Sequence, residues 1–205
     1  MILKFENLTG SLIIALIVCV LLLSKANTAS AQDNPANNEI AEKTQPAASE
    51  KVLEPKTIND LYYKNIIPGI TSEKDALKIM GGKFEKKREN EDKTISYIFD
   101  SKVPGYPNEF TVDSIGKVIH AAIVPAPGEK LNISAVEKIL GKPDRHGFSH
   151  YAFFLRVHVF AKSGMVFICN ETGDVHETQY FEKCDLPAFE KKFGKNFPEK
   201  SPYKY

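Results

Sequence analysis

The sequence predicts an α+β fold of two tandem repeats, each a helix followed by three antiparallel strands, with the helices packed on one face of the sheet. The first observation is a helix with a polar N-cap at Ser72, which recurs 60 positions later with Asn132 as its N-cap. The second is a hairpin pattern: Phe110–Val118 aligns without a gap on Phe167–Val175, with Phe, Asp or Asn, Gly and Val at matching places. Two such units in the same order indicate an internal duplication, and helices segregated on one side of an antiparallel sheet are typical of α+β domains.

The first 31 residues have the features of a secretory signal peptide. Lys4 supplies a positive charge, the twelve residues from Leu12 to Leu23 are all apolar, and Ala29-Ser30-Ala31 offers small side chains to signal peptidase. We expect cleavage after Ala31 and an exported protein, either periplasmic or secreted, with no stable membrane span afterwards. An uncleaved anchor is the alternative, but a spanning helix needs about 20 apolar residues.

Residues 32–56 have the composition of a flexible linker. They include three prolines and no aromatic residue. Such a segment buries too little apolar surface to offset the entropy lost on ordering it. Every aromatic residue other than Phe5 lies after this segment. The folded part is therefore predicted as repeat 1 over residues 57–128 and repeat 2, with a C-terminal helix, over residues 129–205.

Repeat 1 is expected to open with a short helix that begins at Thr57 and ends before Pro68. Ser72 then caps a second helix, which ends at Gly81. Alternating apolar residues and the turn residues between them predict three strands. These strands cover residues 94–99, 109–112 and 118–124.

Repeat 2 follows the same order. Asn132 caps a helix that ends at Gly141. The pattern then predicts strands over residues 150–161, 165–169 and 175–181. After Cys184 the sequence predicts one more amphipathic helix, with Leu186, Phe189 and Phe193 on its apolar face.

Composition and motifs exclude several classes of function. The chain has 27 Lys+Arg against 26 Asp+Glu and a formal net charge of +1. A nucleic-acid binder would carry a basic excess, so we expect no nucleic-acid partner. The sequence contains no Gly-x-Ser-x-Gly, His-Glu-x-x-His, Cys-x-x-Cys or phosphate-binding glycine loop. We therefore predict a protein that is not an enzyme and has no cofactor.

Two short motifs resemble a known family. Ile67-Pro-Gly-Ile-Thr-Ser72 precedes a short helix, and Ile139-Leu-Gly-Lys-Pro-Asp144 follows one. Both resemble small exported bacterial proteins of the SmpA/OmlA type. The duplicated layout is similar to that of the secreted β-lactamase-inhibitor protein, which belongs to the same structural class. The resemblance spans about residues 57–181 and implies tandem helix-plus-sheet units that bind other proteins and do no chemistry.

Histidines near residue 146 form the best candidate for a metal site. Asp144, His146 and His150, with His158 or His176, are residue types that suit zinc. Histidines four residues apart converge on a helix, but the Pro and Gly around His146 favour a loop. We therefore predict no metal site, and a metal-dependent hydrolase remains an alternative.

Cys169 and Cys184 allow three interpretations. An exported protein favours a disulfide between them. A straight strand would place Cys184 about 30 Å from Cys169, so the bridge requires the chain to double back near residues 182–183. The alternatives are a nucleophile with a histidine base and a small core side chain at Cys169.

The predicted strand over residues 150–161 is apolar on both faces. One face carries Tyr151, Phe153, Leu155, Val157 and Val159, and the other carries Ala152, Phe154, Arg156, His158 and Phe160. A half-exposed strand should be polar on its second face. Either the helix over residues 186–193 or a second copy of the chain covers this face, or a partner protein does. Aromatic and Arg side chains are frequent binding hot spots, so we predict protein-binding residues at Phe154, Arg156, His158 and Phe160.

These observations favour an exported, non-enzymatic protein-binding or envelope-associated module. Its partner would be a protein of the cell envelope or outside the cell. A small exported metal- or cysteine-dependent hydrolase and a self-associating structural envelope protein are the alternatives.

Overall fold

The structure is a computed structural model that describes residues 50–149 and 154–200. Chain contacts divide the protein into residues 1–46 and 47–205, and the following description concerns the second unit. The predicted signal peptide and nearly all of the predicted linker lie outside the described residues, as do His150, Tyr151 and Phe153 of the predicted binding strand.

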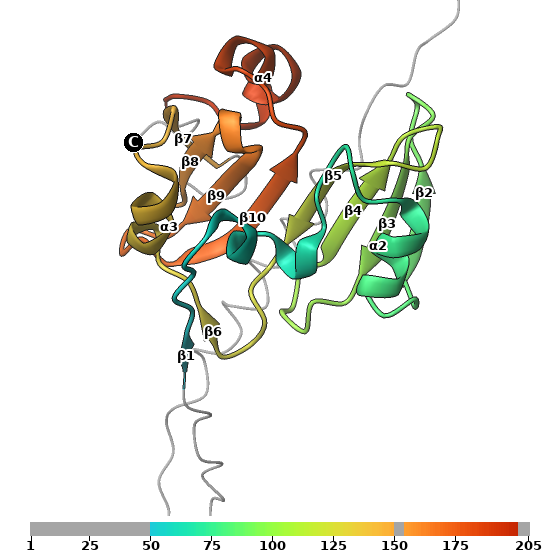
Figure 1. Cartoon of the computed structure of the whole chain (residues 1–205), viewed down its shortest axis with the longest axis horizontal. Helices are drawn as coiled ribbons and strands as arrows, with labels where there is room; N and C mark the ends of the chain where they lie inside the picture. Colours follow the sequence, from blue (N-terminus) through green and yellow to red (C-terminus); the bar gives the residue numbers. More distant parts are fainter. Residues whose placement is uncertain (1–49, 150–153, 201–205) are drawn as a thin grey trace, which may run out of the picture. The chain divides into compact units, whose positions relative to one another are not determined.

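Eight strands form one antiparallel sheet in the order β2-β3-β4-β5-β10-β9-β8-β7 (Figure 1). Its first half holds β2 (Lys86–Glu89), β3 (Ile95–Phe99), β4 (Asn108–Val112) and β5 (Val118–Ile123). Its second half holds β7 (Arg145–Phe148), β8 (Arg156–Phe160), β9 (Met165–Cys169) and β10 (Val175–Phe181). The halves join where β5 pairs with β10, with Ile123 opposite Thr178 and His120 opposite Phe181.

Short elements complete the unit. The α-helices are α2 (Glu73–Ile79), α3 (Ile133–Leu140) and α4 (Leu186–Phe193). The 3-10 helices are η2 (Ile58–Leu61), η3 (Tyr63–Asn65), η4 (Ala161–Ser163) and η5 (Gly194–Asn196). Strand β1 (Lys51–Val52) pairs in parallel with β6 (Glu129–Lys130), which follows β5 in the chain.

The predicted fold class is wrong in its architecture. The described residues form mainly one continuous eight-stranded sheet with three short α-helices, not two helix-plus-three-strand repeats. Each half supplies four strands, and the helices do not share one face. Phe189 of α4 belongs to a different hydrophobic cluster from Ala76 of α2 and Val136 of α3.

The sequence prediction missed the two outer strands of the sheet, β2 and β7, because their composition is unusual for strands. All four residues of β2 are charged and exposed, so they show no apolar alternation. Strand β7 contains Gly147 and follows Pro143, which is a composition typical of a loop. The predicted strand over residues 150–161 is β8 over Arg156–Phe160 within the described residues.

Polar caps fix where the helices begin. Ser72 accepts a hydrogen bond from the Asp75 N–H, and Asn132 accepts one from the Ser134 N–H. Each helix start is also tied to the hairpin turn that follows it. The Glu73 N–H donates to Gly116 O at 2.8 Å, and the Ile133 N–H donates to Gly173 O at 2.8 Å. Positive φ values at these two glycines, +75° and +82°, let the turns approach the helices.

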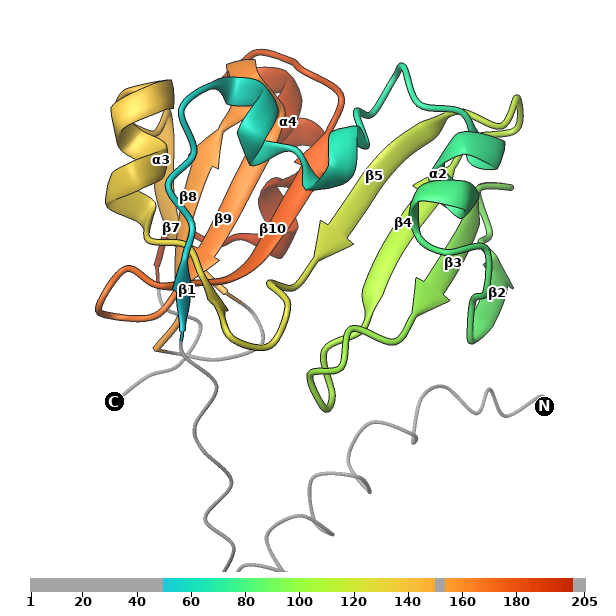
Figure 2. The same ribbon diagram turned by 60° about the horizontal axis from the view of Figure 1, so that its bottom comes forward.

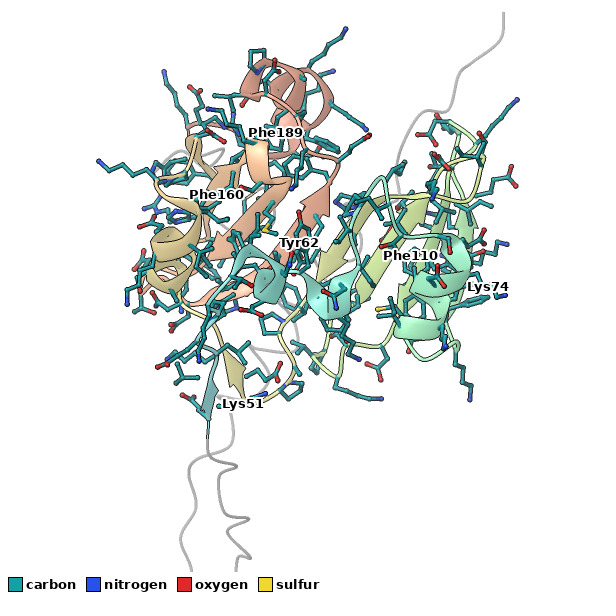
Figure 3. All side chains as sticks on the ribbon, viewed as in Figure 1. Lys51, Tyr62, Lys74, Phe110, Phe160 and Phe189 are labelled. Atoms are coloured by element: carbon teal, nitrogen blue, oxygen red, sulfur yellow. The ribbon has the colours of Figure 1, made fainter. Side chains whose placement is uncertain are left out.

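The sheet carries one hydrophobic cluster on each side. We call the side that carries η2, η3, α2 and α3 the strap face, because Figure 2 shows η2 and η3 lying across its central strands. The other side is the α4 face. Phe110 and Phe160 belong to the strap-face cluster, and Phe189 to the α4-face cluster (Figure 3). Burying a side chain such as Phe189, which is 0% exposed, contributes about 1.5–3 kcal/mol.

Both edges of the sheet are protected against pairing with another chain. At one edge, the charged residues of β2 disfavour strand addition. At the other, the C-terminal segment lies along β7, where the Phe148 N–H donates to Pro198 O at 2.8 Å. A side chain at Gly147 would place its Cβ 3.0 Å from the same oxygen. The glycine therefore allows the C-terminal segment to lie against the strand.

Among the described residues, the helices are too short or too polar to span a bilayer.

Candidate functional site

The predicted binding residues do not form one exposed surface. Phe160 is 2% exposed and packs edge-to-face on Phe167 with 5.7 Å between ring centres, so it belongs to the core. Arg156 is exposed, and its guanidinium carbon lies 4.4 Å from the centre of the Phe148 ring. Phe154 is 44% exposed.

Helix α3 explains why the second face of the predicted strand, the face with His158 and Phe160, is largely apolar. His158 lies next to α3, with its Nδ1 3.8 Å from Glu137 Oε1. The helix over Leu186–Phe193, which the sequence suggested as a cover, packs on the opposite face. The second face of β8 is thus covered within the chain at His158 and Phe160, whereas Arg156 stays exposed, and its apolar composition no longer requires a partner.

Two of the predicted metal-site histidines do come together. His146 on β7 and His158 on β8 are directly paired, and their ring centres are 4.9 Å apart. Burial, and then His146, lower the pKa of His158, while the Glu137 carboxylate opposes them. His176 and Asp144 are exposed. Within residues 50–149 and 154–200, no three metal-ligating side chains are placed to hold an ion.

The two cysteines are free thiols and belong to different sides of the sheet. Cys169 is buried in the strap-face cluster, and Cys184 packs against the α4-face cluster. The disulfide predicted between them is absent from the structure. Burial, with smaller effects of the Asp174 and Glu137 carboxylates, raises the pKa of the Cys169 thiol to about 12. A protonated, buried thiol is a poor nucleophile.

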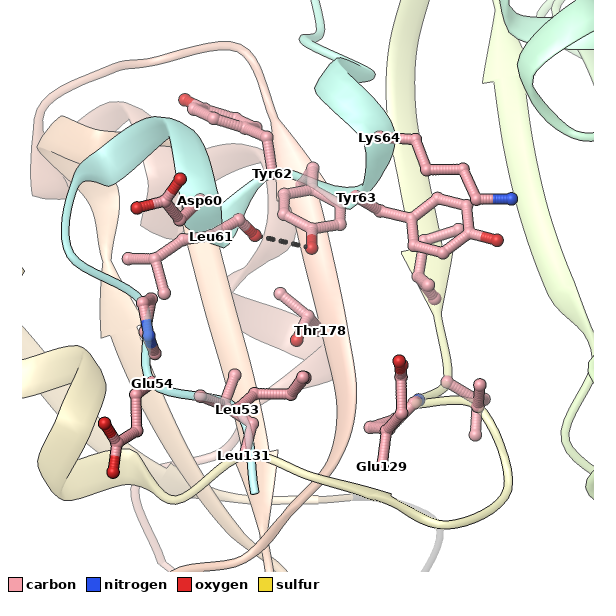
Figure 4. A pocket seen from close by; sticks show the side chains of 16 residues that line it. Leu53, Glu54, Asp60, Leu61, Tyr62, Tyr63, Lys64, Glu129, Leu131 and Thr178 are labelled. Atoms are coloured by element: carbon pink, nitrogen blue, oxygen red, sulfur yellow. Dashed lines mark hydrogen bonds between the residues drawn. The ribbon is translucent and has the colours of Figure 1, made fainter. Parts of the chain in front are cut away.

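A pocket of about 400 Å³ opens on the strap face, beside the central strands β5 and β10 (Figure 4). Its wall combines three chain segments that are distant in the sequence. Leu53–Pro55 and Asp60–Lys64 come before the sheet, Ile123–Ala126 with Glu129 and Leu131 run from the last residue of β5 onward, and Thr178 and Tyr180 belong to β10. We call residues 53–64 the strap.

Backbone pairing holds the strap over the sheet. The Lys51 N–H donates to Gly128 O at 2.7 Å, and the Leu53 N–H donates to Lys130 O at 2.8 Å. Lys51 Nζ also lies 3.1 Å from Glu129 Oε1. Leu53, Glu54 and Pro55 were assigned to the flexible linker, yet here they line one wall of the pocket.

The polar groups around the pocket already have partners within the chain. The Tyr180 hydroxyl donates to Leu61 O at 2.8 Å, and burial raises its pKa well above the ordinary value. The Tyr62 hydroxyl donates to Ser163 O at 3.0 Å. Asp60 accepts from the N–H groups of Lys56 and Thr57, and these hydrogen bonds lower its pKa. The part of the pocket wall that remains open to a ligand is therefore mainly apolar.

The rim of the pocket is charged. Lys64 Nζ lies 5.0 Å from the centre of the Tyr63 ring, and Figure 4 shows both side chains on the opposite side of the pocket from Asp60. Three lining residues are acidic, namely Glu54, Asp60 and Glu129, whereas Lys64 is the single basic one among the lining residues. The rim therefore favours a cationic group.

This pocket was not predicted from the sequence. The adjacent aromatic residues Tyr62 and Tyr63, next to the predicted linker, are the signal that could have indicated it. The contact of this segment with β10, in which Tyr62 stacks on Tyr180 and Tyr180 donates to Leu61 O, follows from the order of strands in the sheet, which local patterns do not contain.

Comparisons of the chain with protein-family models, with curated proteins and with solved structures return no match. The resemblance to the SmpA/OmlA type stays a prediction based on the motifs at residues 67–72 and 139–144.

Proposed function

We propose that the protein is an exported, non-enzymatic module that binds another protein of the cell envelope or the surroundings through the strap-face pocket. The observation that carries this proposal is the pocket itself. It combines apolar walls with buried polar groups that are already hydrogen-bonded, as at Tyr180 and Tyr62. A largely preformed, apolar concave site is typical of binding.

The alternatives draw less support from the described residues. A cysteine hydrolase would need a reactive thiolate, and the pKa of Cys169 is about 12. Self-association through strand pairing would need an edge strand that is free to pair; β7 is occupied by the C-terminal segment through Phe148, and the four residues of β2 are all charged.

An affinity capture tests the proposal. The full chain is immobilised as bait, exposed to the native envelope and secreted fractions, and compared with its Tyr63→Ala variant by quantitative mass spectrometry. We expect one protein that the wild type retains and the variant loses by about tenfold or more, because a central aromatic residue contributes about 2 kcal/mol at a binding hot spot. Tyr106→Ala is the matched control, because Tyr106 is 46% exposed and does not line the pocket.

A second variant guards against a folding defect. Ala126 is exposed at the pocket, so Ala126→Trp adds bulk there without removing a buried group. We expect the same loss of capture with an unchanged thermal midpoint. Equal retention by the wild type, Tyr63→Ala and Ala126→Trp would overturn the assignment of binding to this pocket.

A further inference from the structure

At the rim of the pocket, the ammonium of Lys64 lies over the Tyr63 ring, and the backbone at Lys64 is strained. Its φ is +46° and its ψ +34°, and Asn65 also has a positive φ of +63°. The left-handed region costs a non-glycine residue about 1–2 kcal/mol. Strained backbone concentrates at ligand sites.

Buried residues on both sides keep this turn in place. Leu61 and Ile66 are 5% and 0% exposed, and the Ile66 N–H donates to Tyr63 O at 2.9 Å. Lys64 itself is exposed, and its ammonium lies 5.0 Å from the Tyr63 ring centre. The face of the Tyr63 ring therefore attracts a cation, and in this structure that cation is the ammonium of Lys64.

The surrounding charges point to the same kind of ligand. The lining carboxylates of Glu54, Asp60 and Glu129 outnumber the ammonium of Lys64, although Asp60 lies across the pocket from Tyr63 and already accepts from the Lys56 and Thr57 N–H groups. The Glu129 side chain is 33% exposed, although it pairs with Lys51. Beside these groups, Leu53 and Leu131 provide apolar wall, as Figure 4 shows.

We infer that the pocket takes a segment of the partner protein in which an apolar side chain is followed by Lys or Arg, with the cation over Tyr63 in the place of the Lys64 ammonium. This inference rests on the proposed function and adds the chemistry of the partner. The apolar side chain lies against Leu53 and Leu131. The Lys64 ammonium competes with the partner's cation for the Tyr63 ring, and it turns to solvent when the partner binds.

Two labelled peptides test the inference on the full chain. One is acetyl-Gly-Phe-Lys-Gly-amide, and the other replaces its lysine with norleucine, which has a similar length and no charge. Fluorescence anisotropy should show the lysine peptide binding about fivefold more tightly, since a cation–π contact adds about 1 kcal/mol. The preference should shrink as the salt concentration rises.

Substitutions at Lys64 and Tyr63 test the competing cation and the aromatic ring separately. Lys64→Met should raise the affinity for the lysine peptide about threefold, because it removes the competing cation. Lys93→Met is the matched control: Lys93 is also a left-handed lysine, with φ +64°, but it lies between β2 and β3. Tyr63→Leu should abolish the preference between the two peptides.

Equal affinity of the two peptides, no detectable binding of either, or an unchanged affinity after Lys64→Met would overturn the inference. If capture of a partner still depends on Tyr63 in those cases, the proposed function stands without it. If Tyr63→Ala leaves capture unchanged, the pocket itself is the wrong site. If Tyr63→Ala instead converts a dimer into a monomer in light scattering, the occupant is a second copy of the chain, and the inference is wrong.

Discussion

Lys64 and Asn65 are consecutive left-handed residues, and only Asn is a residue type that tolerates this region well. The chain pays for this conformation through the packing of Leu61 and Ile66, both of which are buried. A glycine at position 64 would adopt the same backbone without the steric penalty of Cβ.

Lys64→Gly should therefore raise the free energy of unfolding by about 0.5–1 kcal/mol, the relief of strain exceeding the added flexibility of the unfolded chain. Chemical denaturation measures this difference. Lys74→Gly is the control of opposite sign: Lys74 lies inside α2, where glycine costs about 1 kcal/mol. Equal losses in both variants would show that the turn at Lys64 stores no strain.

Between elements, we expect the contact of β7 and β8 with α3 to weaken at low pH. His158 on β8 lies between His146 on β7 and Glu137 on α3. Burial and the neighbouring histidine keep the pKa of His158 below its ordinary value of 6.5. The unfolded chain therefore binds a proton at this residue at a higher pH than the folded protein does, and stability falls with pH below about 6.5.

We expect His158→Gln to flatten the loss of stability between about pH 7 and pH 5, because this side chain no longer takes up a proton on unfolding. Denaturation at several pH values measures the slope. His176→Gln, at an exposed position of β10, should keep the slope of the wild type. A wild-type slope in the His158→Gln variant would contradict the prediction.

Local patterns indicated most individual elements but not their arrangement. The expected strand over residues 109–112 agrees with β4 (Asn108–Val112), and the helix capped by Asn132 agrees with α3. Alternation reports that one side of a strand is buried, but it does not say which strands are neighbours. Alternation also gives no signal at β2, where every residue is charged and exposed.

The candidate site was harder to predict than the elements for the same reason. Its wall joins Leu53, Val124 and Tyr180, which the strand order brings together. The sequence instead drew attention to Phe160, which is large and apolar because it fills the core. An apolar second face indicates cover, but not whether a partner or the chain itself provides it.

For the whole molecule, the C-terminal segment closes one edge of the sheet. Phe197 is 3% exposed and stacks on Phe189 with 6.1 Å between ring centres. It holds the adjacent Pro198, whose carbonyl accepts from the Phe148 N–H on β7. A released segment would leave an open edge strand, which is prone to pair with another chain.

Phe197→Ala should lower the free energy of unfolding by about 3 kcal/mol and cause self-association that increases with protein concentration. Light scattering over a range of concentrations detects it. Val166→Ala is the matched control, because Val166 belongs to the same α4-face cluster but lies on β9, away from the segment. That variant should lose stability and keep the mass of the wild type, and a monomeric Phe197→Ala variant would show that the segment does not guard the edge.

The pairing of β1 with β6 fastens one wall of the pocket, and a pulling force would reach this pairing first. A pull on the chain before Lys51 acts first on the hydrogen bonds from Lys51 to Gly128 and from Leu53 to Lys130, and on the ion pair of Lys51 with Glu129. These bonds hold the strap, whereas the sheet beneath is bonded along its whole length. Tension would therefore peel off one wall of the pocket while the sheet stays folded, and a bound partner would be released under load.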